Sequence, residues 1–153
     1  MKRIFGEYEV VVDAKWRFML PADFRKKLPE GGGESFVVKK GYDNSIEMYT
    51  VEVWEKKAGQ ISKLNDLDPE ERMMKRLLLN GVKYVDVDSA GRILLPKVLC
   101  EQVGIKKDMV FAAQGDKVEI WDRDTYYRYM DDNTNETSAL AAKLAAKGIN
   151  LNQ

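Results

Sequence analysis

One nine-residue pattern occurs twice in this chain, and it limits the possible folds more than any other feature. It reads DAKWRFMLP from Asp13 and DSAGRILLP from Asp88. The likeness continues on both sides: VVDAKWRFMLPADFRKKL parallels DVDSAGRILLPKVLCEQV, and SIEMYTVEVW parallels KVEIWDRDTY. Each copy has about 45 residues, which is too few for most chains to bury a stable core. We therefore expect two copies that complete one shared core, within one molecule or between molecules.

Short strands are expected to dominate each copy. EYEVVVD and KYVDVD are rich in β-branched and aromatic residues, and RFMLP and RILLP have the apolar character of short buried strands. The four-residue turn between these segments predicts a β-hairpin in which Asp13 or Asp88 closes the turn, with Gly91 at a left-handed position. A second hairpin follows in each copy, with DN at 43–44 and GD at 115–116 as its turn.

Helices are predicted after these strands. Pro21 and Pro96 suit the first turn of a short helix in each copy. The segment between the copies reads as two helices, the second with Asp68 as its N-cap. The polar and then alanine-rich segment after about residue 130 is expected to be mobile, forming a helix only against a partner. The large apolar residues expected to pack the linker helices into the core are Trp54, Ile61, Leu64, Met73, Met74, Leu77 and Leu78.

Composition excludes several classes of function. The 153 residues include 25 Lys and Arg, 25 Asp and Glu, no His and one cysteine, Cys100. Without histidine the usual general base and the commonest transition-metal ligand are missing, and one cysteine forms neither an internal disulfide nor a cysteine-built metal site. We expect no cofactor, no metal and no enzyme activity. Since no stretch reaches the roughly 18 apolar residues that span a bilayer, we expect a cytoplasmic protein without a membrane partner.

The Asp and Arg of each repeated pattern form the candidate functional feature. Asp13 with Arg17, and Asp88 with Arg92, are spaced for a charge-assisted bond across a tight turn. On its own such a pair is usually structural, because most exposed ion pairs contribute little. Retention of the arginine in both copies, beside Lys15 in the first, favours a use for the guanidinium itself. Its planar fork matches phosphate oxygens or the O6 and N7 edge of guanine.

The segments GEYEVVVDAKWRFMLPADFR and VDVDSAGRILLP, with the strand ends IEMY and VEIWD, resemble the MraZ family over about residues 1–126. These are the two-repeat members of the AbrB/SpoVT swapped-hairpin superfamily. The resemblance implies an α+β, mainly β fold: a pseudo-symmetric double-psi, swapped-hairpin β-barrel with linker helices. It divides the chain into a first repeat over 5–52, a helical linker over 53–80, a second repeat over 81–126 and a C-terminal tail over 127–153.

The resemblance also implies a function. MraZ proteins are bacterial transcriptional regulators that bind direct repeats in the promoter of their own division and cell-wall gene cluster and assemble into rings. By this resemblance the partners are double-stranded DNA and further copies of the chain, with no small-molecule substrate, and the chain acts as a repressor associated with the nucleoid. The implied DNA-contacting residues are Arg17, Arg92 and Lys15, and the residues expected to hold the loops are Asp13, Asp88 and Gly91.

Two departures from the family pattern matter. Trp16 stands where the family usually has glycine, as the second copy does at Gly91. If this position needs a positive φ, the tryptophan is strained there, and we expect its indole to pack against the protein rather than to contact DNA. The second copy has Cys100 in place of Arg25 and lacks a counterpart of Lys15. The first repeat is therefore expected to carry more of the DNA affinity.

Three other interpretations stay open. A related antitoxin would bind a protein partner, although such a chain has one repeat and a disordered tail. A carboxylate-based hydrolase would use Asp86 with Asp88, or Glu7 with Glu9, yet acidic residues on the wet face of a strand are ordinary. A ring-forming scaffold would have lost DNA binding because of Trp16.

Overall fold

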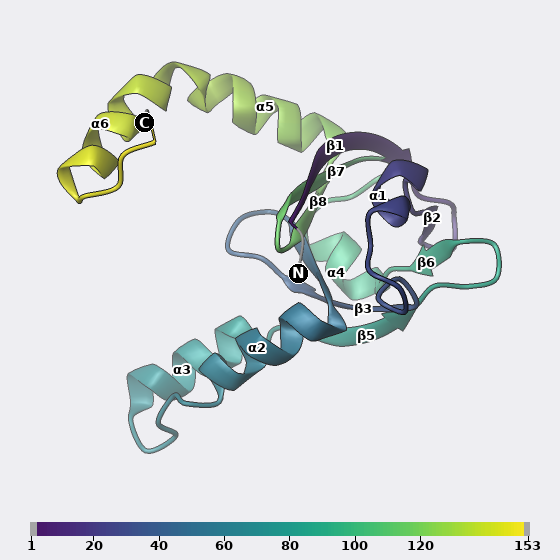
Figure 1. The fold of residues 1–153 in the computed structure, drawn as a ribbon, viewed down its shortest axis with the longest axis horizontal. Helices are drawn as coiled ribbons and strands as arrows, with labels where there is room; N and C mark the ends of the chain where they lie inside the picture. The colour runs from purple at the N-terminus through teal and green to yellow at the C-terminus, as the bar shows by residue number, and fades with distance from the viewer. Residues whose placement is uncertain (1–2, 152–153) are drawn as a thin grey trace.

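The structure, a computed structural model, describes residues 3–151, and its two halves have the same order of elements (Figure 1). The first half contains β1 (Ile4–Val11), β2 (Arg17–Met19), α1 (Ala22–Lys26), β3 (Ser35–Lys40), β4 (Ile46–Thr50), α2 (Val51–Ile61) and α3 (Pro69–Leu78). The second contains β5 (Lys83–Asp86), β6 (Arg92–Leu94), α4 (Lys97–Gln102), β7 (Asp108–Gly115), β8 (Val118–Asp122), α5 (Arg123–Asn133), the 3-10 turn η1 (Thr134–Glu136) and α6 (Thr137–Ala146). The repeat in the sequence is thus a repeat of structure.

Each half gives its first strand to the hairpin of the other half. The six-stranded antiparallel sheet has the order β1-β7-β8-β4-β3-β5. β1 pairs with β7, from Ile4 opposite Gly115 to Val11 opposite Asp108, and β5 pairs with β3. β4 and β8 join the two hairpins in the middle of the sheet. The prediction that the copies complete one core is confirmed, within a single molecule.

The first hairpin predicted in each copy forms only at its turn, and the predicted pairing of its two strands is wrong. Both turns close, because the backbone N–H of the loop aspartate donates to the carbonyl of the arginine four residues later, at 2.8 and 2.9 Å. After the turn, however, β2 pairs with β6, and only one isolated bridge, between Val87 and Ile93, joins the expected partners. Pairing across the halves brings together Phe18 and Ile93, which are 1% and 0% exposed. A hairpin within one copy would not do so.

Other predicted elements are present. The hairpins β3–β4 and β7–β8 are confirmed, as is the N-cap of α3, where Asp68 accepts hydrogen bonds from two backbone N–H groups. The fold is α+β and mainly β. Within residues 3–151 the strands do not close into the expected barrel, because β1 and β5 end the sheet and β2 pairs with β6 in a separate ribbon.

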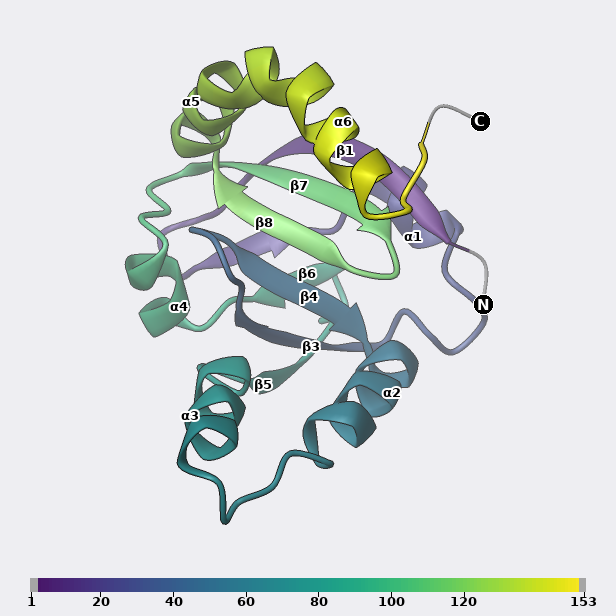
Figure 2. The same cartoon turned by 90° about the vertical axis from the view of Figure 1, so that its left-hand side faces the viewer.

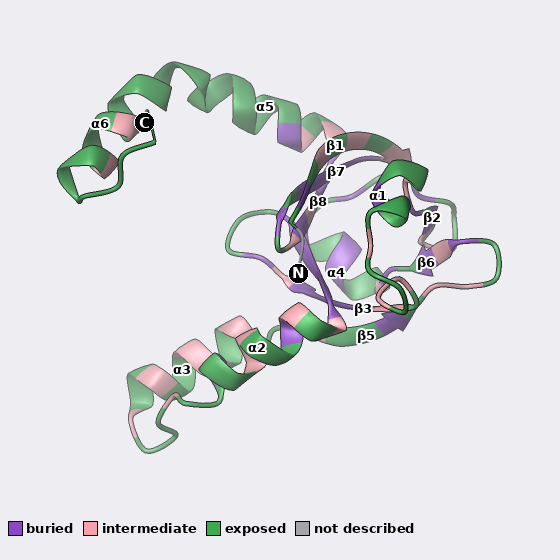
Figure 3. Cartoon of the chain, in the orientation of Figure 1, coloured by how far each residue is buried: buried purple, intermediate pink, exposed green. Residues whose placement is uncertain are grey.

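The shared core is centred on rings from both halves. Phe111 of β7 lies 4.9 Å from the ring of Phe24 in an edge-to-face contact, and 6.0 and 6.2 Å from the rings of Phe18 and Tyr8. Buried residues are concentrated in β3, β4, β7 and β8 (Figure 3). Phe24 of α1 and Leu99 of α4 are also buried. Phe111 belongs to the second half and the other three rings to the first. The largest cluster of buried residues therefore draws on both halves.

The linker helices fulfil the packing prediction only in part. Trp54 and Ile61 of α2 are buried and pack with Tyr49 of the hairpin. In α3, which has no buried residue, Met73 and Leu77 are 54% and 59% exposed, so core packing is wrong for them. Leu64 and Leu78 are partly buried against the same cluster, so α3 reaches the core only near its C-terminal end.

The segment that follows β8 is helical and mirrors the linker. Thr50 accepts a hydrogen bond from the N–H of Val53 at the start of α2, and Asp122 accepts one from the N–H of Thr125 at the start of α5. α5 and α6 lie at one edge of the sheet, and α2 and α3 lie at the opposite edge (Figure 2). Both pairs project to the same side of the molecule (Figure 1). Tyr126 anchors α5 by an edge-to-face contact with Trp121. Mobility of the tail over 127–153 stays a prediction.

Candidate nucleic-acid interface

The loop between β1 and β2 is organised by one carboxylate. Oδ1 of Asp13 accepts hydrogen bonds from the backbone N–H groups of Lys15 and Arg17, both at 2.9 Å. Oδ2 accepts a third from Nε of Arg17, also at 2.9 Å. The expected Asx turn is confirmed, and the side-chain bond fixes the direction of the guanidinium.

The loop between β5 and β6 repeats this arrangement. Oδ1 of Asp88 accepts from the N–H groups of Ala90 and Arg92, at 2.9 and 2.8 Å, and Oδ2 accepts from Nε of Arg92 at 3.0 Å. In both loops Nε is occupied, whereas no residue within 3–151 bonds to the two terminal amino groups of the arginine. Each loop thus presents an oriented guanidinium whose outer donors are available.

Both loop carboxylates are held in the ionised form. The pKa of Asp13 lies below its ordinary value of 3.8, chiefly because the backbone N–H of Arg17 donates to it, with the guanidinium adding to the effect. The same groups of Arg92 lower the pKa of Asp88. A carboxylate that accepts several hydrogen bonds is stabilised in its charged form. The Asp–Arg pairs therefore persist at neutral pH.

The ribbon places both guanidinium groups on one face of the molecule. In the β2–β6 ladder Arg17 lies opposite Leu94, and Arg92 lies opposite Met19. Residues opposite each other share a face, and the middle residue of each strand points into the core. The side chains of Arg17 and Arg92 are 32% and 36% exposed. In Figure 1 this ribbon and its two loops lie at the opposite end of the molecule from the projecting helices.

The two loops differ at the residue before the arginine. Trp16 has φ 67° and its counterpart Gly91 has φ 86°, so both adopt the left-handed conformation. The expectation that tryptophan is strained here is confirmed, at a cost of about 1–3 kcal/mol. The indole is half-buried and packs against the core, as expected. Packing of the ring offsets part of this strain.

Sequence reasoning missed a groove beside the first loop. It has a volume of about 470 Å³, and Lys15 and Trp16 line it together with Lys83, Tyr84 and Lys97 of the second half. These last three residues come next to the first loop only through the exchange of strands. A side chain far away in sequence gives no signal of such proximity. The groove thus brings two further lysines, Lys83 and Lys97, beside Lys15 of the first loop.

The comparison with known families agrees with this geometry. A family model described as "MraZ protein, putative antitoxin-like" matches residues 4–77 and again residues 78–147. The chain belongs to the MraZ family. Each match starts at or just before the first strand of one half and reaches into its last helix. The helices after β4 and β8 are thus part of the MraZ repeat.

Relatives in the MraZ family cover almost the whole chain. A protein of Cytophaga hutchinsonii is 34% identical over 141 residues, 92% of this chain and 93% of that protein. One of Acetivibrio thermocellus is 36% identical over 145 residues, 95% of this chain and 99% of its own length. One of Thermoanaerobacter is 36% identical over 126 residues, 82% of this chain and 85% of that protein. All three carry the name Transcriptional regulator MraZ.

Three carboxylates of the hydrolase alternative, those of Glu7, Asp86 and Asp88, have structural partners. Glu7 accepts a hydrogen bond from the hydroxyl of Tyr126 at 2.6 Å, and Asp86 accepts one from the hydroxyl of Ser35 at 2.6 Å. Asp88 holds the second loop. Each of these three acids thus has a structural role in this MraZ fold. None of these contacts pairs two carboxyl groups across a substrate-sized space.

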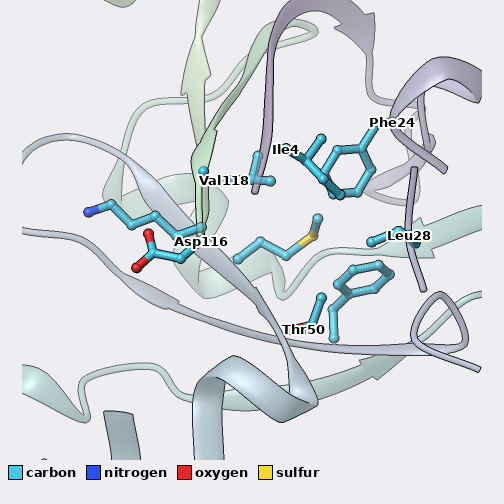
Figure 4. A pocket seen from close by; sticks show the side chains of 10 residues that line it. Ile4, Phe24, Leu28, Thr50, Asp116 and Val118 are labelled. Atoms are coloured by element: carbon cyan, nitrogen blue, oxygen red, sulfur yellow. The ribbon is translucent and has the colours of Figure 1, made fainter. Parts of the chain in front are cut away.

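The apolar cavity between the halves is small. Ile4 and Val118 line it from one side, and Phe24 and Leu28 from another (Figure 4). Its volume of about 20 Å³ admits nothing larger than a water molecule. Within residues 3–151, no cluster of three acids or thiols is placed to hold a metal ion, and no helix is long and apolar enough to cross a membrane.

Proposed function

We propose that the chain is a transcription regulator that binds double-stranded DNA through the outer face of the β2–β6 ribbon. The observation that carries the proposal is the position of Arg17 and Arg92, two oriented guanidinium groups on one exposed face. The name shared by its relatives supports the regulatory role. Its target is the promoter of its own division and cell-wall gene cluster, and it acts there as a repressor by occluding the promoter.

The proposed contact uses the free side of each guanidinium. Asp13 and Asp88 hold Nε, which leaves the two terminal amino groups of each arginine to donate to DNA. Two parallel donors match the O6 and N7 acceptors of guanine in the major groove, or two phosphate oxygens. Lys15 beside Arg17 adds a contact to the backbone of the duplex. The exchange of first strands supports the swapped-hairpin AbrB/SpoVT assignment.

Several copies of the chain are needed for tight binding. One molecule has a formal net charge of zero and offers few phosphate contacts, so affinity comes from a ring of copies that engages several direct repeats at once. The exposed apolar face of α3, with Met73 and Leu77, is the candidate contact between neighbours. It lies at the end away from the ribbon (Figure 1). We place this assembly in the cytoplasm, at the nucleoid.

DNA binding is tested with the region upstream of the chain's own gene and a shuffled duplex of equal length. Wild-type protein should bind the upstream duplex more tightly, with an affinity that falls steeply as salt rises. Arg17→Ala and Arg92→Ala should each weaken specific binding about tenfold or more. Lys147→Ala, a change of equal charge at the end of α6, is the matched control. Wild-type affinity in both arginine variants would contradict the proposal.

Assembly is tested separately by native mass spectrometry. Leu77→Asp places a charge on the exposed face of α3 and should lower the number of subunits, because a desolvated charge opposes an apolar contact. Val98→Asp introduces the same charge in place of an exposed apolar residue of α4 and should leave the assembly intact. An unchanged subunit number in the α3 variant would exclude this face as the contact.

Absence of DNA binding by the wild-type protein would favour the scaffold or the antitoxin-like alternative. The description of the family model names the second of these. In that case the exposed apolar faces of α3 and α6 would be the surfaces for a protein partner.

A further inference from the structure

The second loop has no lysine of its own, yet a cation reaches it from elsewhere in the chain. Lys15 of the first loop has Ala90 as its counterpart in the second. Arg25, on helix α1 of the first half, extends to the second loop. A Cβ atom built on Gly91 would lie 2.6 Å from Nη1 of Arg25 and 3.3 Å from Sδ of Met19. The guanidinium of Arg25 therefore rests directly on the backbone of Gly91.

This contact requires glycine at position 91. Any side chain there would meet the guanidinium, and the φ of 86° also disfavours other residues. The first loop has the opposite combination: Trp16 takes the place of Gly91, and Cys100 takes the place of Arg25. Trp16 and Gly91 are equivalent positions of the two loops. At the second loop Arg25 covers this position, and at the first loop the indole of Trp16 extends from it. The two ends of the ribbon are thus built differently.

Arg25 lies next to the outer face of the ribbon. Met19, whose sulfur approaches the same point of Gly91, stands opposite Arg92 in the ladder and is 52% exposed. Arg25 is itself exposed, and within residues 3–151 no carboxylate lies within ion-pair distance of it. The second loop thus carries one guanidinium paired with Asp88 and one without a counter-ion.

We propose that Arg25 is a third arginine of the DNA-binding face and gives the second loop the cation that Lys15 gives the first. The inference rests on the proposed DNA binding. Arg25 has no carboxylate partner within residues 3–151, so a phosphate of the duplex can serve as its counter-ion. Arg25 belongs to the first repeat by sequence but acts at the second loop. The second loop then has a cation besides Arg92, which reduces the expected bias toward the first repeat without removing it, since Lys15, Lys83 and Lys97 line one groove at the first loop.

The test measures binding of the full chain to its upstream duplex by fluorescence anisotropy at several salt concentrations. Arg25→Ala should weaken binding about tenfold and lower the slope of log K against log salt by about one per bound protomer. Lys26→Ala removes the same charge from the next residue of α1 and should change affinity less than about twofold. Equal losses in the two variants would overturn the proposal, because Arg25 would then act through net charge alone.

Two further variants separate charge from folding and from the proposed function. Arg25→Gln keeps two of the three methylene groups of the side chain and removes the charge, so it should fold as wild type and still show the loss. Adding Ala90→Lys to Arg25→Ala should restore most of the affinity for DNA. If it restored none, the claim that Arg25 takes the place of a lysine in the second loop would be contradicted. If Arg17→Ala and Arg92→Ala lose binding while Arg25→Ala does not, this inference alone fails. If none of these variants differs from wild type, the proposed function fails as well.

Discussion

Asp13 and Asp88 each bind three donors of their own loop, and this sets how the loops respond to pH. Hydrogen bonds from the arginine that follows lower both pKa values below the ordinary 3.8. A group with a lowered folded-state pKa contributes its stability above the unfolded value, and the contribution is lost as pH falls through the folded value. The loops should therefore be indifferent to pH through the neutral range.

The corresponding measurement is DNA affinity between about pH 6 and 8 at constant ionic strength. We expect the plot of DNA affinity against pH to show no midpoint that depends on Asp13 or Asp88. The variant Lys147→Ala should give the same plot. Loss of loop order should begin only below about pH 4, where these carboxyl groups gain protons. A midpoint near neutral pH that disappears in Asp88→Asn would contradict the account of the loops.

Cys100 offers a second test at the scale of one residue. Burial raises the pKa of its thiol to about 12, and its side chain is inaccessible. Because the thiolate is the reactive form, a disulfide reagent at about pH 8 should leave the native protein unmodified and label it fully after denaturation. Rapid stoichiometric labelling of the native chain would show that α4 does not bury this residue.

Short-range features were predictable from the sequence at this scale, and long-range ones were not. Asp13 and Arg17 are four residues apart, so an Asx turn and an ion pair follow from spacing and chemistry. The contact of Arg25 with Gly91 joins two repeats, and Lys97 reaches the first loop in the same way. No local pattern shows such contacts, because they depend on which strands are exchanged.

At the scale of elements, a buried charge cluster connects the hairpins. Glu47 of β4 accepts hydrogen bonds from the hydroxyl of Tyr49 at 2.7 Å, from Lys117 at 3.1 Å and from Lys39 at 3.4 Å. Burial raises the pKa of Glu47, but the bonds from Tyr49 and the charges of Lys117 and Lys39 outweigh it and lower the pKa. Lys117 precedes β8, so the cluster links the two halves.

Removing this charge should destabilise the fold. Glu47→Gln leaves Lys39, 2% exposed, without its counter-ion, and we expect a loss of about 3 kcal/mol in the free energy of unfolding. Glu119 lies opposite Glu47 in the β4–β8 ladder. Glu119→Gln should cost about 1 kcal/mol or less, because its hydrogen-bond partners Gln114 and Trp121 are neutral and its ion pair with Lys117, at 3.9 Å, is long. Chemical denaturation measures both, and equal losses would contradict the role of the cluster.

Strands were easier to predict than their partners. The strand positions and both later hairpins follow from β-branched runs and turn residues, which are local. The pairing of β2 with β6 does not, since it depends on burying Phe18 and Ile93 together. Met73 and Leu77 of α3 were wrongly assigned to the core, whereas Leu78 does pack against it. A helical period shows that a face needs a partner but not which partner covers it.

At the scale of the molecule, the exchange of strands makes the halves interdependent. Fragments 1–80 and 81–153 should not fold as monomers, because each lacks the first strand that the other supplies to its hairpin. Mixed in equal amounts, they should recover the circular dichroism and cooperative unfolding of the intact chain. Cooperative unfolding of either fragment as a monomer, established by sedimentation, would contradict a shared core.

The central claim places the duplex on the outer face of the ribbon, and site-directed crosslinking tests it most directly. Leu94→Cys, at a ribbon position 56% exposed, and Leu140→Cys, on α6 and 50% exposed, would each carry a photoreactive group, with buried Cys100 giving no background. The account predicts crosslinks from position 94 to the upstream duplex and few from position 140. Crosslinks from position 140 alone would place the DNA at the opposite end of the molecule and contradict it.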